Sequence, residues 1–100
     1  MKKLLLTFTL VLTAFTVFSQ TEINGIVTDA TGIPITGANV IIKGSTFGAI
    51  TDFDGKFTFT TDLSGEQIIR ISYVGFETFE KIINCDGNTI NADAVLAEGG

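Results

Sequence analysis

The sequence predicts an all-β fold, a seven-stranded antiparallel β-sandwich that follows a cleaved signal peptide. After position 20, short runs of alternating apolar and polar residues recur at roughly ten-residue spacing, separated by glycine-containing turns. Val, Ile, Phe and Thr dominate these runs and suit a pleated, half-buried surface. No segment after position 20 sustains the 3.6-residue period of an amphipathic helix. This pattern is typical of a small sandwich.

The first nineteen residues have the organisation of a secretory signal peptide. Lys2 and Lys3 give a positive start, and residues 4–18 form an apolar run. Val17-Phe18-Ser19 then supplies the small or modest side chains expected before cleavage at Gln20. A membrane span needs about 20 apolar residues, and this run is shorter. An uncleaved N-terminal anchor is the alternative, but we expect an exported chain whose folded part begins at Gln20.

Four strands are predicted in the first half of the domain, at residues 21–29, 38–43, 48–52 and 56–60. Alternation turns every second side chain toward the core. Ile23, Gly25 and Val27 are expected to share one face of the first strand, and Phe57 and Phe59 one side of the fourth. In the second strand, Ala38, Val40 and Ile42 are expected to point inward. Between the first two strands, Gly32 and Pro34 favour a turn, because Gly accepts positive φ and Pro presets its own.

The tightest predicted turn is Asp52-Phe53-Asp54-Gly55, because Asp-Gly is among the strongest hairpin signals. In the structural interpretation, Asp52 and Asp54 accept backbone N–H bonds within the turn while Gly55 takes positive φ. The alternative is a Ca²⁺ loop, since hard cations take several carboxylate and carbonyl oxygens. The EF-hand spacing is not met, because its first ligand would fall on Ile50.

Three further strands are predicted, at 67–74, 76–83 and 89–96. Gly75 separates the first two and indicates a bend or bulge. The residues expected to share a face are Ile69, Ile71 and Tyr73 in the first of these strands, Phe79 and Ile83 in the second, and Ile90, Ala92, Ala94 and Leu96 in the third.

Cleavage after Ser19 would leave 81 of the 100 residues, enough for one small domain. That part keeps 4 of the 6 basic residues and all 11 acidic ones, for a formal charge of −7. Nucleic-acid binding needs clustered Lys and Arg, so this charge argues against it. It also argues against electrostatic docking on anionic lipid. After cleavage, we expect no direct insertion into a membrane.

The cysteine and histidine content argues against several kinds of catalytic site. Cys85 is the single cysteine, which rules out an intramolecular disulfide and leaves a bridge between two chains as an alternative. The sequence has no His, so a Ser-His pair is excluded and Cys85 has no activating base. One Cys and carboxylates do not make the usual zinc ligand set. A glycosidase pair would need two opposed carboxylates, but the acids sit mostly in turns. We expect no enzyme activity and no cofactor.

Four aromatic residues could form a binding surface. Phe47, Phe53, Tyr73 and Phe76 would then make a platform for a sugar ring or a protein partner. Packing in the core is the alternative role for the same side chains.

Five short motifs follow one another along the chain. They are Gly25-Ile26-Val27-Thr28-Asp29, Gly32-Ile33-Pro34-Ile35-Thr36-Gly37-Ala38-Asn39-Val40, Lys43-Gly44-Ser45-Thr46 with Gly48, Thr51-Asp52-Phe53-Asp54-Gly55-Lys56-Phe57, and Ile71-Ser72-Tyr73-Val74-Gly75-Phe76. In this order the chain resembles the carboxypeptidase-regulatory-like domain, a transthyretin-like or prealbumin-like β-sandwich, over residues 20–97. Residues 98–100 would then begin a linker or end the chain.

Directly behind a signal peptide, this domain resembles the N-terminal extension of SusC/RagA-type TonB-dependent outer-membrane receptors, which import glycans or peptides with a surface lipoprotein partner. The resemblance implies a non-catalytic accessory domain in the periplasm or at the outer membrane. Its partners would be the receptor plug and barrel or other envelope proteins. Transport itself is not expected from this chain, which is either a receptor fragment or free-standing. The alternative is a secreted or cell-surface module that binds glycan or protein.

Overall fold

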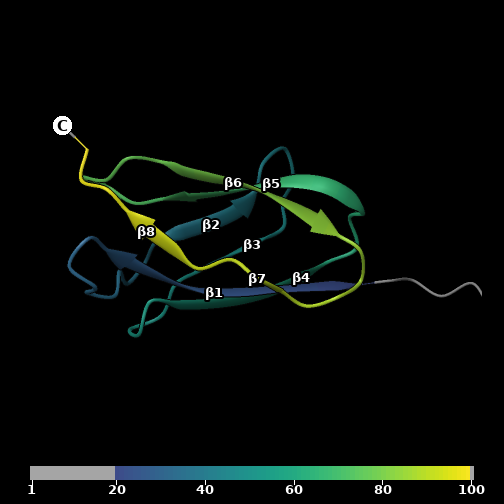
Figure 1. Ribbon diagram of the computed structural model, residues 1–100, viewed down its shortest axis with the longest axis horizontal. Helices are drawn as coiled ribbons and strands as arrows, with labels where there is room; N and C mark the ends of the chain where they lie inside the picture. The colour runs from purple at the N-terminus through teal and green to yellow at the C-terminus, as the bar shows by residue number, and fades with distance from the viewer. Residues whose placement is uncertain (1–19, 100) are drawn as a thin grey trace, which may run out of the picture.

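The structure is a computed structural model that describes residues 20–99, and these residues form eight β-strands and no helix (Figure 1). The strands are β1 (Thr21–Asp29), β2 (Asn39–Ile42), β3 (Gly48–Ile50), β4 (Lys56–Thr61), β5 (Gly65–Ser72), β6 (Phe79–Cys85), β7 (Ile90–Asn91) and β8 (Ala94–Leu96). The predicted signal peptide at 1–19 lies outside the described residues. In the described part, no helix is long and apolar enough to cross a membrane.

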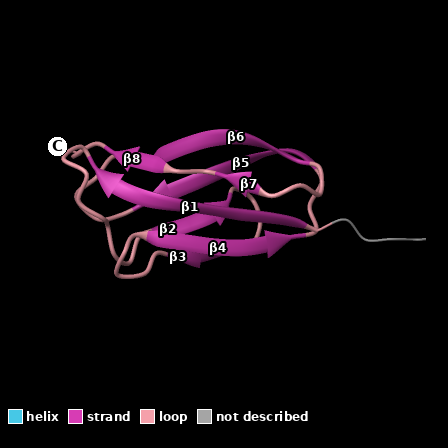
Figure 2. Cartoon of the chain, turned by 60° about the horizontal axis from the view of Figure 1, so that its bottom comes forward, coloured by secondary structure: helices cyan, strands magenta, loops and turns pink. Residues whose placement is uncertain are grey.

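The strands form two packed sheets, which confirms the predicted all-β sandwich (Figure 2). In one sheet, β1 lies between β4 and the short strands β7 and β8. In the other, the order is β3-β2-β5-β6, and every pair is antiparallel. The prediction of a purely antiparallel sandwich is wrong at one edge, because β7 and β8 both run parallel to β1.

The predicted count of seven strands is also wrong, because the expected final strand is divided into β7 and β8. The Ala92 N–H donates to the Asn24 carbonyl oxygen at 2.7 Å, and the Asp93 carboxylate then accepts the Ile26 N–H at 2.8 Å. The Asp93 side chain thus takes the place of a strand carbonyl beside β1. Glycine is needed at position 25, opposite the break between β7 and β8, since a Cβ there would lie 2.7 Å from the Ala92 backbone.

The other predicted strands agree with the structure to within a few residues, except the one expected at 76–83. β6 begins three residues later, and Phe76 lies outside it. The Phe76 N–H donates to the Tyr73 carbonyl oxygen at 3.1 Å, which closes a turn between β5 and β6. Tyr73 was expected to share a face with Ile69 and Ile71 in the preceding strand. That expectation is wrong, because β5 ends at Ser72 and the Tyr73 side chain is 37% exposed.

The core lies between the two sheets and contains most of the apolar side chains that alternation placed on one face of a strand. The buried apolar residues are Ile23, Val27, Ile35, Ala38, Val40, Ile42, Phe57, Ile69, Ile71, Ile83, Cys85, Ala92, Ala94 and Leu96. Phe59, Phe79 and Ile90 pack against this cluster and are only partly buried. Within residues 20–99, every buried side-chain nitrogen or oxygen has a hydrogen-bond partner, as a small core without disulfides requires.

Candidate interaction surface

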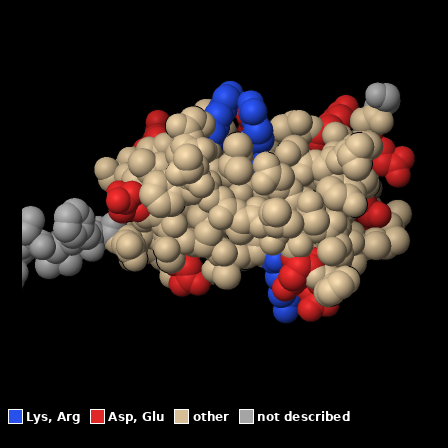
Figure 3. Space-filling view, turned by 180° about the vertical axis from the view of Figure 1, so that it is seen from behind, with Lys and Arg blue, Asp and Glu red and all other residues tan. Residues whose placement is uncertain are grey.

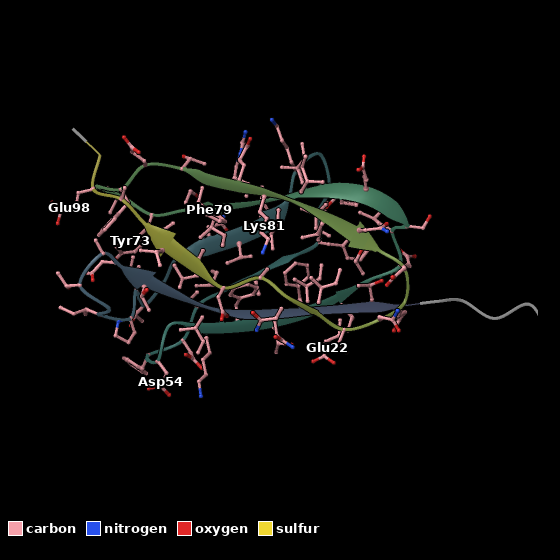
Figure 4. All side chains as sticks on the ribbon, in the orientation of Figure 1. Glu22, Asp54, Tyr73, Phe79, Lys81 and Glu98 are labelled. Carbon is pink, nitrogen blue, oxygen red and sulfur yellow. The ribbon has the colours of Figure 1, made fainter. Side chains whose placement is uncertain are left out.

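Four segments that are far apart in the sequence meet at one end of the sandwich. They are the β1–β2 loop, the turn between β3 and β4, the β5–β6 loop and the last described residues, 97–99. Asp54, Tyr73 and Glu98 lie at this end, and Glu22 lies toward the opposite one (Figure 4). We call the first the loop end. Functional side chains often lie on loops held by a rigid scaffold.

The Asp29 carboxylate organises the start of the β1–β2 loop. Its Oδ1 accepts the Thr31 hydroxyl at 2.7 Å, the Thr31 N–H at 2.9 Å and the Ile33 N–H at 3.0 Å. The Asp29 N–H in turn donates to the Ile33 carbonyl oxygen at 2.9 Å. The Thr31 hydroxyl, followed by the Ile33 N–H, holds the pKa of Asp29 below its usual range, because both bonds favour the ionised form. A charged acceptor therefore fixes this part of the loop.

The turn between β3 and β4 is built around Asp52. Its Oδ1 accepts the N–H groups of Asp54 and Lys56, both at 2.9 Å, and its carbonyl oxygen accepts the Gly55 N–H at 2.9 Å. Gly55 has a φ of 73°, and a Cβ there would lie 2.5 Å from the Val27 carbonyl oxygen. Asp54 was expected to accept turn bonds with its carboxylate. In these bonds it supplies its own N–H instead.

Thr51 is the buried link between the β1–β2 loop and this turn. Its side chain is 4% exposed, and its hydroxyl donates to the Ile35 carbonyl oxygen at 2.6 Å while accepting the Ala38 N–H at 2.8 Å. Its carbonyl oxygen also accepts the Gly37 N–H at 3.0 Å. Sequence reasoning did not single out Thr51, because one Thr in a Thr-rich β-sequence carries no mark of burial.

The four aromatic residues considered as a platform do not share one surface. Tyr73 and Phe76 lie together at the loop end, with ring centroids 6.0 Å apart and planes inclined by 46°. Phe53 is at the tip of the Asp52 turn and is 89% exposed. Phe47 is partly buried against the core in the β2–β3 hairpin. The strand registers place that hairpin at the opposite end from Ser72, so a single platform is ruled out.

The last described residues form a strap over the β5–β6 loop. The Glu77 N–H donates to the Ala97 carbonyl oxygen at 2.7 Å, and the Gly99 N–H donates to the Gly75 carbonyl oxygen at 3.0 Å. The chain is thus hydrogen-bonded to the sandwich as far as Gly99 and leaves it at the loop end (Figure 1). The domain boundary expected after Ala97 stays a prediction.

Three large apolar side chains project from the loops at this end. They are Ile33, Phe53 and Val74, which are 61%, 89% and 86% exposed, and we call them the tip residues. Their loops are in contact. The Thr36 hydroxyl reaches the Phe53 carbonyl oxygen at 3.5 Å, and a Cβ on Gly37 would meet the Tyr73 ring at 3.8 Å. Sequence analysis missed Ile33 and Val74, because a single apolar residue in a loop carries no sign of exposure.

Acidic residues surround the tip residues. The segments of the loop end carry Asp29, Asp52, Asp54, Glu77 and Glu98, with Lys56 as the adjoining base at the start of β4. Seen from behind, the molecule shows several red side chains at the end away from residue 20, others at the opposite end, and blue ones nearer the middle, one group of them beside red side chains (Figure 3). Two other basic residues form ion pairs on the other sheet, where Lys43 and Arg70 approach Glu80 at 3.5 and 2.9 Å.

An open groove of about 510 Å³ lies on the outer face of the sheet that contains β1. Its lining residues are Glu22, Asn24, Gly25, Ile26, Asp52, Lys56, Phe57, Thr58 and Asn91. The Asn24 and Asn91 side chains are 3.2 Å apart, and the Thr58 hydroxyl reaches the Glu22 carboxylate at 3.3 Å. The groove is open, and its lining mixes polar side chains with the apolar Ile26 and Phe57. Within residues 20–99, no three Cys, Asp or Glu side chains converge to hold a metal ion.

The thiol of Cys85 is buried at the end of β6. Burial raises the pKa of this thiol, and the negative charge of Asp86 raises it further. The thiol is therefore mainly protonated near neutral pH, whereas a cysteine nucleophile needs a thiolate.

The family can now be assigned from the comparison with known proteins. Residues 23–99 match the CarboxypepD_reg-like domain. The chain belongs to this family. The match covers nearly all of the sandwich, including the strap. It confirms the resemblance drawn from the five sequence motifs.

Curated relatives of this CarboxypepD_reg-like domain are TonB-dependent receptors. The TonB-dependent receptor SusC of Bacteroides thetaiotaomicron is 45% identical over 76 residues, which cover 74% of this chain and 7% of the receptor. A TonB-dependent receptor of Formosa agariphila is 44% identical over 62 residues, which cover 62% of this chain and 6% of the receptor. The chain thus spans less than a tenth of the length of either relative.

Solved structures show the same sandwich in unrelated settings. Chlorocatechol 1,2-dioxygenase from Pseudomonas putida matches with a TM-score of 0.66 at 14% identity, over 80% of this chain and 61% of the other. A cohesin-X-dockerin complex from Acetivibrio cellulolyticus matches with a TM-score of 0.61 at 24% identity, over 81% and 58%. At this identity the likeness concerns the fold alone, because one fold hosts many functions.

Proposed function

We propose that this CarboxypepD_reg-like domain is a non-catalytic accessory domain of a TonB-dependent outer-membrane receptor. The residues at 1–19 would export it, and it would lie in the periplasm ahead of the receptor's plug and barrel. The observation that carries this proposal is the 45% identity to the SusC receptor over 76 residues, 74% of this chain. The absence of His from the sequence and the protonated, buried Cys85 support a role without catalysis.

The test begins with the gene beyond codon 100. The proposal expects a reading frame that continues into a TonB-dependent receptor, and a frame that ends there with no receptor gene nearby would overturn it. In the continuing case, residues 20–99 are deleted in frame and nutrient uptake is compared with the amount of receptor in the outer membrane. An accessory role predicts altered uptake at an unchanged receptor level.

A second candidate is a free-standing module that binds glycan or protein at the cell surface. The 89% exposure of the Phe53 ring favours it, because exposed aromatic rings stack on sugars and anchor partners. A glycan array probed with residues 20–100 would then show binding that Phe53→Ala removes. Absence of binding by the wild-type domain would sink this candidate.

A further inference from the structure

We infer that the tip residues Ile33, Phe53 and Val74 dock onto the receptor polypeptide that follows Gly100. This inference rests on the proposed function and identifies the surface through which the domain would act. The partner surface is expected to be apolar and bordered by Lys or Arg. Three features of the loop end lead to this conclusion: exposed apolar side chains on rigid loops, the exit of the chain beside them, and the surrounding acidic charge.

The loops that carry the tip residues are held in place by hydrogen bonds, although the tip side chains are exposed to solvent. Asp29 fixes the loop that carries Ile33 through three hydrogen bonds from Thr31 and Ile33. Asp52 fixes the turn that carries Phe53, and Thr51 ties these two segments together. A rigid apolar projection loses little conformational entropy when it is buried, which favours binding.

The exit of the chain places its continuation next to this surface. Gly99 is bonded to Gly75, which directly follows Val74. A segment joined after Gly100 therefore starts within a few residues of the tip. Tethering gives such a segment a millimolar effective concentration, so a contact too weak to form between separate molecules can form here. More than nine-tenths of the SusC relative lies outside the matched region and could supply this segment.

Charge and the arrangement of the aromatic rings favour a receptor segment over two other partners, a second copy of the domain and a sugar. A second copy of the domain would bring one acidic border against another, and like charges oppose such a contact. A sugar ring would find one freely exposed aromatic face, because Tyr73 and Phe76 are packed on each other. A receptor surface with Lys or Arg around an apolar patch satisfies both the tip residues and their acidic border.

The experiment compares amide hydrogen exchange in two contexts. The full-length gene product is purified from outer membranes in detergent, and residues 20–100 are purified alone. Peptides that cover the β1–β2 loop, the Asp52 turn and the β5–β6 loop are expected to exchange about tenfold more slowly in the full-length protein. Equal exchange in both contexts would overturn the inference.

Two variants make the result specific. Phe53→Ser/Val74→Ser should abolish the protection of the three segments, whereas Ile82→Ser, at a β6 position that is 67% exposed, should leave it intact. Thermal unfolding of the isolated domain shows that each variant folds. Concentration-dependent dimerisation of the isolated domain that the double substitution removes would assign the surface to a second copy and also overturn the inference.

Failure of the inference can be told apart from failure of the proposed function. A reading frame that does not lead to a receptor would overturn both the proposed function and the docking inference. A receptor whose three segments exchange as fast as those of the isolated domain removes only the docking surface.

Discussion

The hydroxyl of Thr51 donates to the carbonyl oxygen of Ile35 at 2.6 Å, and this contact joins the β1–β2 loop to the turn between β3 and β4. The same hydroxyl accepts the Ala38 N–H, and all three residues are buried. A buried backbone group that loses its partner costs about 1–3 kcal/mol. The loop end therefore depends on a single side chain that two backbone groups share.

Replacing Thr51 by Val keeps the shape of the side chain and removes both bonds. We expect Thr51→Val to lower the free energy of unfolding by about 2–4 kcal/mol, measured by urea denaturation of residues 20–100. Thr60→Val, at an exposed position of β4, is the matched control and should change it by less than about 0.5 kcal/mol. Similar losses for both variants would show that the buried bonds do not matter.

Gly55 is required both for its backbone angle and for the space around it. Gly32 has a φ of 86° with no atom within 4 Å of a built Cβ, whereas Gly55 has a φ of 73° and would place its Cβ 2.5 Å from the Val27 carbonyl oxygen. Gly32→Ala should cost about 1–2 kcal/mol for the left-handed conformation alone. Gly55→Ala should cost at least about 3 kcal/mol, because backbone strain is added. Chemical denaturation gives both values, and equal costs would contradict the steric argument.

The pKa of Asp29 should depend on a single hydroxyl. Thr31→Ala removes the largest cause of its lowering, so the pKa should rise toward the usual value of about 3.9. Carbon-detected NMR titration of the Asp29 carboxyl group measures the change. Thr36→Ala, in the same loop, should leave the Asp29 pKa unchanged. A low pKa that survives Thr31→Ala would assign the effect to the backbone bonds.

The same lowered pKa predicts how stability depends on pH. Because the folded pKa of Asp29 lies below the unfolded one, its contribution is present above about pH 4 and is lost as pH falls through the folded value. The difference in the free energy of unfolding between the wild type and Asp29→Asn should therefore shrink as the pH falls from about 5 toward the folded pKa of Asp29. Denaturation curves at several pH values test this, and a constant difference would contradict it.

The extent of the sandwich could be predicted because its strands obey a simple period. Ile23 and Val27 in β1, like Ile69 and Ile71 in β5, alternate with polar or less buried neighbours, and the alternation alone placed each pair on one face of its strand, the face that is buried in the structure. The division between β7 and β8 could not be predicted in this way. Ala92, Ala94 and Leu96 keep their period across the break, and the break depends on the Asp93 carboxylate bonding a strand amide.

The loop end was harder to predict, because its geometry comes from contacts between distant segments. The Asp-Gly turn was visible from residue types, but the roles of Asp52 and Asp54 within it depend on which carboxylate faces the amides. The exposure of Val74 follows from the end of β5 at Ser72 and from the strap beyond it. Local residue types carry no information about either.

Lys81 places a charge on the inner face of an edge strand. In β6 it shares its side with the buried Ile83 and Cys85, yet its own side chain is exposed. β6 is the last strand of its sheet and has a partner on one side (Figure 1). An inward-pointing charge on an edge strand opposes pairing with another chain, because pairing would bury it. We therefore expect Lys81→Ile to promote self-association of residues 20–100.

Sedimentation velocity at increasing protein concentration should show dimers or larger species for Lys81→Ile and a monomer for the wild type. Lys43→Ile makes the same chemical change just beyond β2, outside a strand edge, and should stay monomeric. Far-ultraviolet circular dichroism checks that both variants keep their strands. If the two variants associate equally, added hydrophobicity is the cause and β6 has no special role. Association confined to Lys81→Ile would identify the charge as the feature that keeps the open edge of the sandwich from pairing.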